Sequence, residues 1–219
     1  MLDKTNNPTD LITDMGKRAR ATAAILARTP TSQKAKALNA AAIALREDAN
    51  AILDANATDL AAGREKGLAN AMLDRLALDG KRLEAIAAAL EAVARLPDPV
   101  GDVIDESAPA NGLKLKRVRV PLGVVGIIYE SRPNVTADAG ALAMMAGNAA
   151  ILRGGTEAVN SNRAIHAALV EPVENVPQRL VVAVARNFGR YDRLKLRLRV
   201  LDAADAVFDF RACGIDVQR

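Results

Sequence analysis

The stretch GVVGIIYESRPNVTADAGALAMMAGNAAILRGG, residues 123–155, constrains the fold more than any other part of the chain. An apolar run at Gly123–Tyr129 is followed by a helical pattern of small residues, Val135–Ala146, and by a second apolar run at Ala149–Leu152. Short apolar runs without alternation are typical of strands that are buried on both faces of a parallel sheet. Strand, helix and strand in this order predict a right-handed βαβ unit, and therefore an α/β fold.

Polar residues come directly after both predicted strands. The segment ESRPN, residues 130–134, follows the first strand, and RGGTE, residues 153–157, follows the second. In open α/β sheets, ligands bind just outside the carboxyl ends of the strands, which is the edge where both segments lie. We therefore expect the two segments to face one cleft.

The second segment has the features of an anion site. Gly154 and Gly155 permit close approach of a ligand to the backbone, and a helix predicted from Thr156 to about Val170 offers N–H groups at its start. Arg153 adds a guanidinium that can bind a phosphate through two hydrogen bonds. The alternative is that the glycines only turn the chain and that Arg153 pairs with a surface acid. The spacing leaves both open, because no G-x-G-x-x-G motif is present.

Asn134 ends the first segment and also has two interpretations. Pro133 restricts the backbone of Arg132 and ends the strand, so that Asn134 stands at the start of the next helix. A neutral amide held rigidly at a strand end is a suitable donor for an oxyanion. An ordinary helix N-cap explains an asparagine in this position equally well.

The residues before this stretch predict helices and then a hairpin. Residues 10–95 carry apolar side chains three and four apart, which predicts a layer of amphipathic helices that ends before Pro97. Residues 103–107 and 113–120 alternate or run apolar around Asn111-Gly112, a dipeptide that favours tight turns. We therefore expect a β-hairpin over about residues 103–120.

The segment VPLGVVGIIYESRPNVTAD, residues 120–138, resembles the signature of the gamma-glutamyl phosphate reductase (glutamate-5-semialdehyde dehydrogenase) family of the aldehyde dehydrogenase superfamily. Residues 38–46, 56–60, 96–101 and 147–155 are similar to that family as well, so the resemblance covers about residues 10–170. It implies an α/β fold in which an N-terminal helical layer joins part of a Rossmann-type parallel sheet. It also implies a homo-oligomer, with the hairpin as the oligomerisation element.

The resemblance further implies NADPH-dependent reduction of L-glutamyl 5-phosphate to L-glutamate 5-semialdehyde with release of phosphate, in proline biosynthesis. In that family a cysteine thiolate attacks the acyl phosphate, and a hydride then reduces the thioester. Asn134 matches the amide that stabilises the oxyanion, and Arg153 matches a basic residue beside the adenosine ribose, where it suits a 2′-phosphate. The residues assigned to the cofactor are Arg153, Gly154, Gly155, Thr156 and Glu157, and those assigned to the substrate are Glu130, Ser131 and Arg132.

The composition changes after about residue 170. Residues 171–219 contain all three Phe, and basic residues alternate with leucines at 193–199, as in a strand with one solvated basic face. Acidic residues in the same segment offset much of that charge, so no nucleic-acid partner is predicted. We expect a partial cofactor-binding domain over residues 1–170 and a divergent tail over residues 171–219, with the family's catalytic domain missing.

Cys213 is the only cysteine and lacks the Gly-Asn-Cys context that the family uses. We name it as a candidate catalytic thiol, although an ordinary tail cysteine is the favoured interpretation. One His and one Cys exclude a zinc site. No run reaches the roughly 18 apolar residues of a membrane helix, and no signal peptide is recognisable, so a cytoplasmic protein without a membrane partner is expected. Two functions stay open, an acyl-phosphate reductase and a catalytically inactive fragment that binds nucleotide or oligomerises.

Overall fold

The structure, a computed structural model, describes residues 8–170 and 182–184. The chain begins with the helices α1 (Pro8–Leu26), α2 (Thr31–Glu47), α3 (Ala49–Glu65), α4 (Asn70–Leu76) and α5 (Gly80–Ala94). Helix α5 has a side-chain cap, because Asp79 accepts a hydrogen bond from the N–H of Arg82 at 2.6 Å. The predicted N-terminal helical layer is confirmed. Within the described ranges, no helix is both long enough and apolar enough to cross a membrane.

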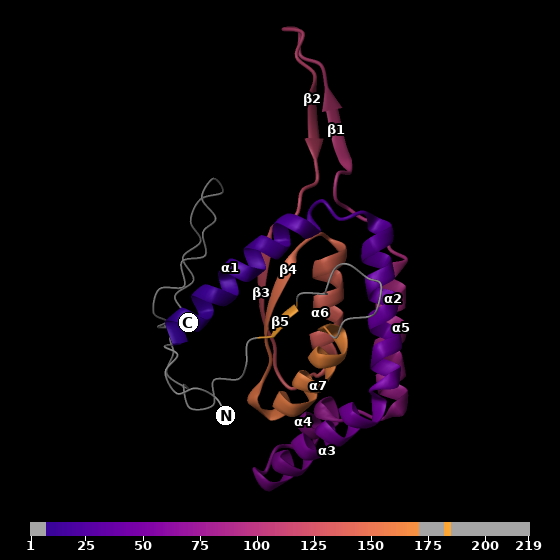
Figure 1. The fold of residues 1–219 in the computed structure, drawn as a ribbon, viewed down its shortest axis with the longest axis vertical. Helices are drawn as coiled ribbons and strands as arrows, with labels where there is room; N and C mark the ends of the chain where they lie inside the picture. Colours follow the sequence, from indigo (N-terminus) through magenta and orange to yellow (C-terminus); the bar gives the residue numbers. More distant parts are fainter. Residues whose placement is uncertain (1–7, 171–181, 185–219) are drawn as a thin grey trace.

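The predicted hairpin is also confirmed. Strands β1 (Val103–Ser107) and β2 (Leu115–Val118) pair antiparallel and project from the body of the molecule (Figure 1). The connection is longer than a two-residue turn, and Gly112 adopts a φ of 81° within it. Every residue from 101 to 120 is exposed, so the hairpin contributes nothing to the core.

The βαβ unit has the order that the sequence predicts. Strand β3 (Val124–Ile128), helix α6 (Asn134–Met145) and strand β4 (Ala149–Arg153) are followed by the short 3-10 helix η1 (Thr156–Ala158) and by α7 (Val159–Val170). A further strand, β5 (Val182–Val184), pairs parallel to β4 and gives the sheet order β3-β4-β5. The α/β class is therefore confirmed, and the sheet includes three residues of the segment predicted to be a divergent tail.

The helices cover both faces of this sheet. Helix α1 lies against one face, α6 and α7 lie against the other, and α2 and α5 form a further layer outside α6 (Figure 1). The core between these layers consists largely of Ala and Leu side chains, with Met144 and Met145 near the end of α6. Small side chains let the layers approach closely, which agrees with a chain that has no Trp and only three Phe.

The end of α6 is fixed by a glycine cap. The N–H of Gly147 donates to the carbonyl of Met144 at 2.9 Å, and the N–H of Asn148 donates to that of Ala143 at 2.8 Å, which is a Schellman motif. Gly147 adopts a φ of 74°, and a Cβ there would lie 2.9 Å from Cγ of Pro121. Because Asn148 then accepts the N–H of Gly123 at 2.8 Å, the cap also aligns the starts of β3 and β4.

A buried ion pair holds α2 to the same end of α6. Lys34 is buried, and its Nζ lies 2.7 Å from Oδ2 of Asp98 and donates to the carbonyl of Met145 at 3.3 Å. Asp98 also accepts hydrogen bonds from the hydroxyl of Thr31 and from the N–H of Val100. Burial alone would raise the pKa of Asp98, but these hydrogen bonds outweigh it and lower that pKa below its ordinary value.

Candidate active-site cleft and strand-end loops

The two polar segments leave the sheet from one edge. Ile128 pairs with Arg153 at the ends of β3 and β4, and the N–H of Tyr129 donates to the carbonyl of Arg153 at 3.0 Å. The two segments also touch, because the hydroxyl of Ser131 donates to Oε1 of Glu157 at 2.6 Å. Both segments thus lie at the carboxyl ends of neighbouring strands, but of the two only the segment 130–134 lines the cleft described below, so the expected shared cleft is not found among the described residues.

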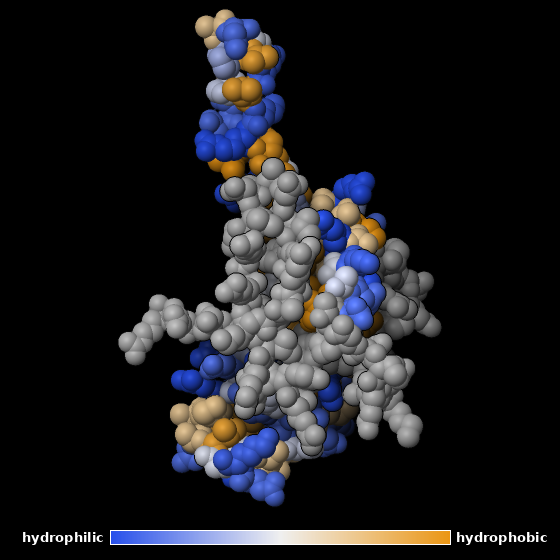
Figure 2. All heavy atoms as spheres, turned by 90° about the vertical axis from the view of Figure 1, so that its left-hand side faces the viewer, coloured by the Kyte–Doolittle hydropathy of each residue, from blue (hydrophilic) through white to orange (hydrophobic). Residues whose placement is uncertain are grey.

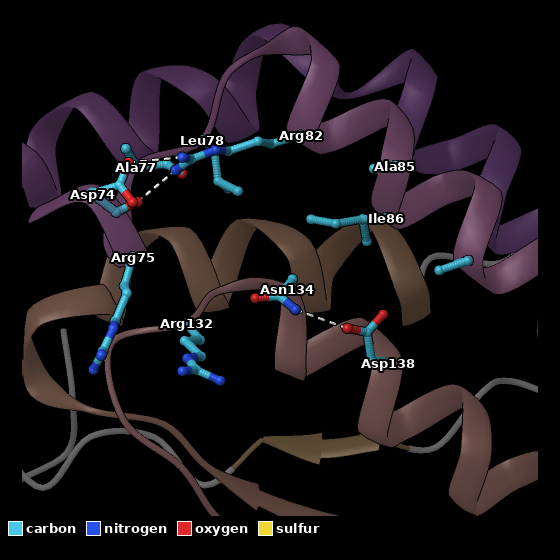
Figure 3. A pocket seen from close by; sticks show the side chains of 11 residues that line it. Asp74, Arg75, Ala77, Leu78, Arg82, Ala85, Ile86, Arg132, Asn134 and Asp138 are labelled. Carbon is cyan, nitrogen blue, oxygen red and sulfur yellow. Dashed lines mark hydrogen bonds and ion pairs between the residues drawn. The ribbon is translucent and has the colours of Figure 1, made fainter. Parts of the chain in front are cut away.

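The residues after β3 point in different directions. Ser131 is buried and is directed to Glu157, whereas Glu130 and Arg132 are exposed. Arg132 lines an open cleft together with Asn134 (Figure 3). Of the three residues assigned to the substrate, Arg132 is therefore the one that faces this cleft.

The N-cap interpretation of Asn134 is wrong. Pro133 occupies the N-cap position of α6, and Asn134 is the first helical residue. Its side-chain Nδ2 donates forward to Oδ2 of Asp138 at 2.8 Å, one turn along the helix. A backbone cap would use the side-chain oxygen as an acceptor, so the amide orientation here serves Asp138 and the cleft instead.

The glycines after β4 are closely packed against neighbouring side chains of the protein. Both Gly154 and Gly155 are buried. A Cβ on Gly154 would collide with the side-chain amide of Asn162, and a Cβ on Gly155 would lie 2.6 Å from Oε1 of Glu157. Packing against the buried Asn162 therefore explains Gly154 without a ligand, whereas the neighbour of Gly155 is the end of a flexible side chain. The assignment of both glycines to the cofactor stays a prediction.

Glu157 is fixed by its neighbours. Thr156 starts η1, a 3-10 turn that precedes α7 where a single helix was expected, and its hydroxyl donates to Oε2 of Glu157 at 3.1 Å. Burial favours the neutral form of Glu157, but the hydrogen bonds from Ser131, Thr156 and backbone N–H groups outweigh it and lower the pKa of Glu157. The carboxylate is therefore charged and held in place at this edge of the sheet.

The base of the first loop is anchored by a chain of hydroxyl and amide groups. The Tyr129 hydroxyl lies 2.6 Å from Oγ1 of Thr136. The Thr136 hydroxyl in turn donates to Oδ1 of Asn162 at 3.1 Å. Burial raises the pKa of the Tyr129 hydroxyl, so it stays protonated. The chain connects the end of β3 to α6 and α7, and it keeps the first turn of α6 in place.

The cleft lies between α4 and α5 on one side and the first turns of α6 on the other (Figure 3). It has a volume of about 450 Å³. Its polar lining is formed by Asp74, Arg75, Arg82, Arg132, Asn134 and Asp138. Arg153 is not one of the described residues that line it, so the cleft brings together Asn134 and Arg132 but not Asn134 and Arg153.

Sequence reasoning missed the part that the helices contribute. Arg75 and Asp138 were not singled out, and Arg75 comes to the cleft from α4, a helix far from α6 in the sequence. The four-residue spacing of Asn134 and Asp138 was the one available signal, since such residues lie on the same face of a helix. Burial raises the pKa of Asp138, and the hydrogen bond from Asn134 only partly offsets this.

Neither a thiol nor a metal site can be placed in this cleft. Cys213 lies outside the described residues. Among the residues that are described, no group of three or more His, Cys, Asp or Glu side chains could hold a metal ion.

Solved structures with the same fold define the class. No family model matches the chain. A NAD-dependent benzaldehyde dehydrogenase from Corynebacterium glutamicum superposes with a TM-score of 0.54 at 19% identity, covering 72% of this chain and 33% of that one. At that identity the likeness shows the fold alone. The described residues therefore have the fold of part of an aldehyde dehydrogenase.

Within that class, the similarity is to gamma-glutamyl phosphate reductase. The crystal structure of that enzyme from Thermotoga maritima matches with a TM-score of 0.70 and 44% identity over 73% of this chain and 39% of that one. The gamma-glutamyl phosphate reductase of Rhizorhabdus wittichii is 66% identical over 163 residues, which are 74% of this chain and 38% of the relative. The resemblance found in residues 120–138 is thereby confirmed.

The length of the match differs between relatives. The chain spans less than half the length of the curated relatives that it matches. The reductase of Novosphingobium aromaticivorans matches 84% of this chain at 53% identity, which is more than residues 1–170 can supply. With that relative, the similarity therefore continues beyond residue 170, and the boundary of the tail stays a prediction.

Proposed function

We propose that this chain provides the oxyanion donor and part of the cofactor site of an NADPH-dependent gamma-glutamyl phosphate reductase. The reaction reduces L-glutamyl 5-phosphate to L-glutamate 5-semialdehyde and releases phosphate, in proline biosynthesis. One observation carries the proposal: a chain similar to reductases of that name presents the Asn134 amide in an open cleft at the carboxyl edge of its sheet.

Asn134 would stabilise the charge that develops on the substrate. When a thiolate attacks the acyl carbon, a carbon–sulfur bond forms, the carbonyl oxygen gains negative charge, and phosphate then leaves to give a thioester. The Asn134 amide has two N–H donors, of which one is used by Asp138. The second is available for the oxyanion, and its direction is fixed by the first. The thiol is left unassigned.

Arg153 is the residue that fits the coenzyme. Bound NADPH would supply the hydride that reduces the thioester. The Arg153 side chain is exposed beside the Gly154 turn, and it has no partner within the described part of the chain. A guanidinium in that state suits the 2′-phosphate of NADPH, while Glu157 offers acceptors to ribose hydroxyls. Glu157 and a 2′-phosphate are both negatively charged and repel each other. Binding of the phosphate at this position therefore depends on the positive charge of Arg153.

The coenzyme assignment is tested by fluorescence titration of Arg153→Ala with NADPH and with NADH. We expect affinity for NADPH to fall about 10-fold, the loss of one charge-assisted contact, while affinity for NADH changes little. Arg163→Ala, an exposed arginine on α7, is the matched control. Equal losses for both coenzymes, or none for either, would reject the assignment.

Turnover tests the reaction itself. NADPH oxidation with the acyl phosphate, or the reverse reaction with semialdehyde, phosphate and NADP, should fall about 100-fold or more in Asn134→Ala. Full activity in that variant would exclude Asn134 as the oxyanion donor. Activity that survives Cys213→Ser would exclude that thiol as the nucleophile.

The alternative is that the chain binds nucleotide and associates without turnover. The exposed hairpin favours association, because Ile104 is 53% and Leu115 is 51% exposed, and Figure 2 shows apolar side chains along it. We propose that the hairpin is the contact of a homo-oligomer. Light scattering should give a lower mass for Ile104→Asp with Leu115→Asp than for Glu106→Gln. An unchanged mass would show that the hairpin is not the contact.

A further inference from the structure

Two of the cations that line the cleft beside Asn134 have no partner among the residues that the structure describes. Arg82 is neutralised, since its Nη2 lies 2.8 Å from Oδ1 of Asp74. Arg75 and Arg132 line the same cleft, and neither makes a hydrogen bond or an ion pair with any residue that the structure describes. Two guanidinium groups in one cleft, neither of them paired with a described carboxylate, favour an anionic group on a ligand.

The same cleft also carries an anion, Asp138, without a described cation beside it. Asp138 is half-buried, and Asn134 is the one side chain, among those described, that donates to it. The donor is a neutral amide, so the carboxylate has no counterion among the described residues, and burial raises its pKa. A ligand cation placed against the other carboxylate oxygen would supply the missing charge.

Opposite charges in one cleft, neither satisfied by the other, match the two charges of an α-amino acid. We propose that this cleft binds the α-amino-acid end of the L-glutamyl group, with Asp138 accepting hydrogen bonds from the ammonium and with Arg132 and Arg75 binding the carboxylate. The inference rests on the proposed function, which supplies the substrate, and it makes these residues determinants of specificity.

The spacing along α6 agrees with this placement. Asn134 and Asp138 are one turn apart on one face of the helix, and Nδ2 of Asn134 lies 2.8 Å from Oδ2 of Asp138, so the two side chains offer a donor and an acceptor side by side. The acyl carbon and the amino nitrogen of a glutamyl chain are separated by four bonds, roughly 5 Å when extended. A glutamyl group can therefore present its acyl oxygen at Asn134 and its ammonium at Asp138. The apolar wall formed by Ala85, Ile86 and Ala89 is suited to the methylene groups between them.

The test compares two ligands that differ only in the ammonium group. Calorimetric titration of the full chain with L-glutamate and with glutarate should show L-glutamate bound about 10-fold more tightly, as one charged hydrogen bond would give. Asp138→Asn should retain glutarate binding and lose the preference for L-glutamate. Arg132→Ala should weaken both ligands. Asp54→Asn, at an exposed position of α3, is the control and should retain the preference.

Circular dichroism and urea unfolding of each variant separate a loss of binding from a loss of fold. Equal binding of the two ligands by the unaltered chain would overturn the inference, as would an unchanged preference in Asp138→Asn or no binding of either ligand up to tens of millimolar. The preference for L-glutamate is independent of NADPH. If NADPH binding and turnover are absent but the preference is present, the proposed function fails and the amino-acid site stands. The reverse result would retain the reductase and reject the site.

Discussion

Asp138 lies in the first turns of α6, Asp98 is joined to the end of the same helix through Lys34, and the surroundings of the two carboxyl groups have opposite effects. Asp98 has a buried lysine at 2.7 Å and two further donors, and its pKa is lowered. Asp138 has one neutral donor and an open cleft, and its pKa is raised by burial. A carboxylate that the fold itself satisfies contributes to stability, whereas one that the fold leaves unsatisfied is available to a ligand.

The largest expected effect is that of Asp98→Asn on stability. The substitution removes the negative charge and leaves Lys34, whose side chain is 1% exposed, without a counterion. Loss of one partner of a buried ion pair costs about 3 kcal/mol or more of the free energy of unfolding. Urea unfolding at neutral pH measures this, with the exposed Asp102→Asn as control. A loss within about 1 kcal/mol would mean that Asp98, like Asp138, contributes little to the stability of the fold.

The difference in the free energy of unfolding between the unaltered chain and Asp98→Asn should depend on pH, because the pKa of Asp98 is lowered. A carboxyl whose pKa is lower in the folded state stabilises the protein above its unfolded pKa, about 3.9, and this contribution is lost as the pH falls through the folded pKa. The unaltered chain and Asp98→Asn should therefore differ most near neutral pH and converge in acid. Urea midpoints measured across this range check the sign, and a difference that grows in acid would contradict it.

Ser131→Ala is expected to have an intermediate effect. The substitution removes the 2.6 Å hydrogen bond to Glu157 that joins the two strand-end loops, and Glu157 retains the hydroxyl of Thr156. We expect a loss of about 1–2 kcal/mol and a rise in the pKa of Glu157, because a donor to its charged form is gone. Urea unfolding and carboxyl titration by NMR measure the two effects, with the exposed Ser32→Ala as control. No change in either quantity would mean that the loops are not joined through this bond.

Asp138→Asn should have the smallest effect on stability. The pKa of Asp138 is raised, so its contribution is present below the unfolded pKa and is lost as the pH rises through the folded pKa. At neutral pH the neutral amide should therefore leave the free energy of unfolding within about 0.5 kcal/mol or increase it. Urea unfolding at neutral and acid pH tests this. A neutral-pH loss as large as that of Asp98→Asn would remove the distinction between the two carboxylates.

The βαβ unit could be predicted because its signals are local. Apolar runs, a small-residue helix and the glycine that ends it are contiguous in residues 123–155, and the order of these elements determines how they pair. The hairpin was equally local. The resemblance in residues 120–138 then identified the relatives, which composition and periodicity alone could not have done.

The cleft could not be predicted in the same way. Arg75 and Asp138 are far apart in sequence and line one cleft because the fold brings α4 and α5 to the first turns of α6. The packing that favours glycine at position 154 could not be predicted either, since it depends on the position of Asn162 on α7. Neighbouring strand ends predict which segments share an edge, but the direction of each side chain depends on packing that a sequence pattern does not contain.

The hairpin tip is a suitable site for attaching a label or an added sequence to the molecule. Its tip, residues 108–114, is exposed throughout and is joined to the rest of the chain only through β1 and β2. Exposed loop tips of this kind tolerate added residues, so a fluorophore or an affinity sequence placed there should leave the refolding of the α/β body unaltered.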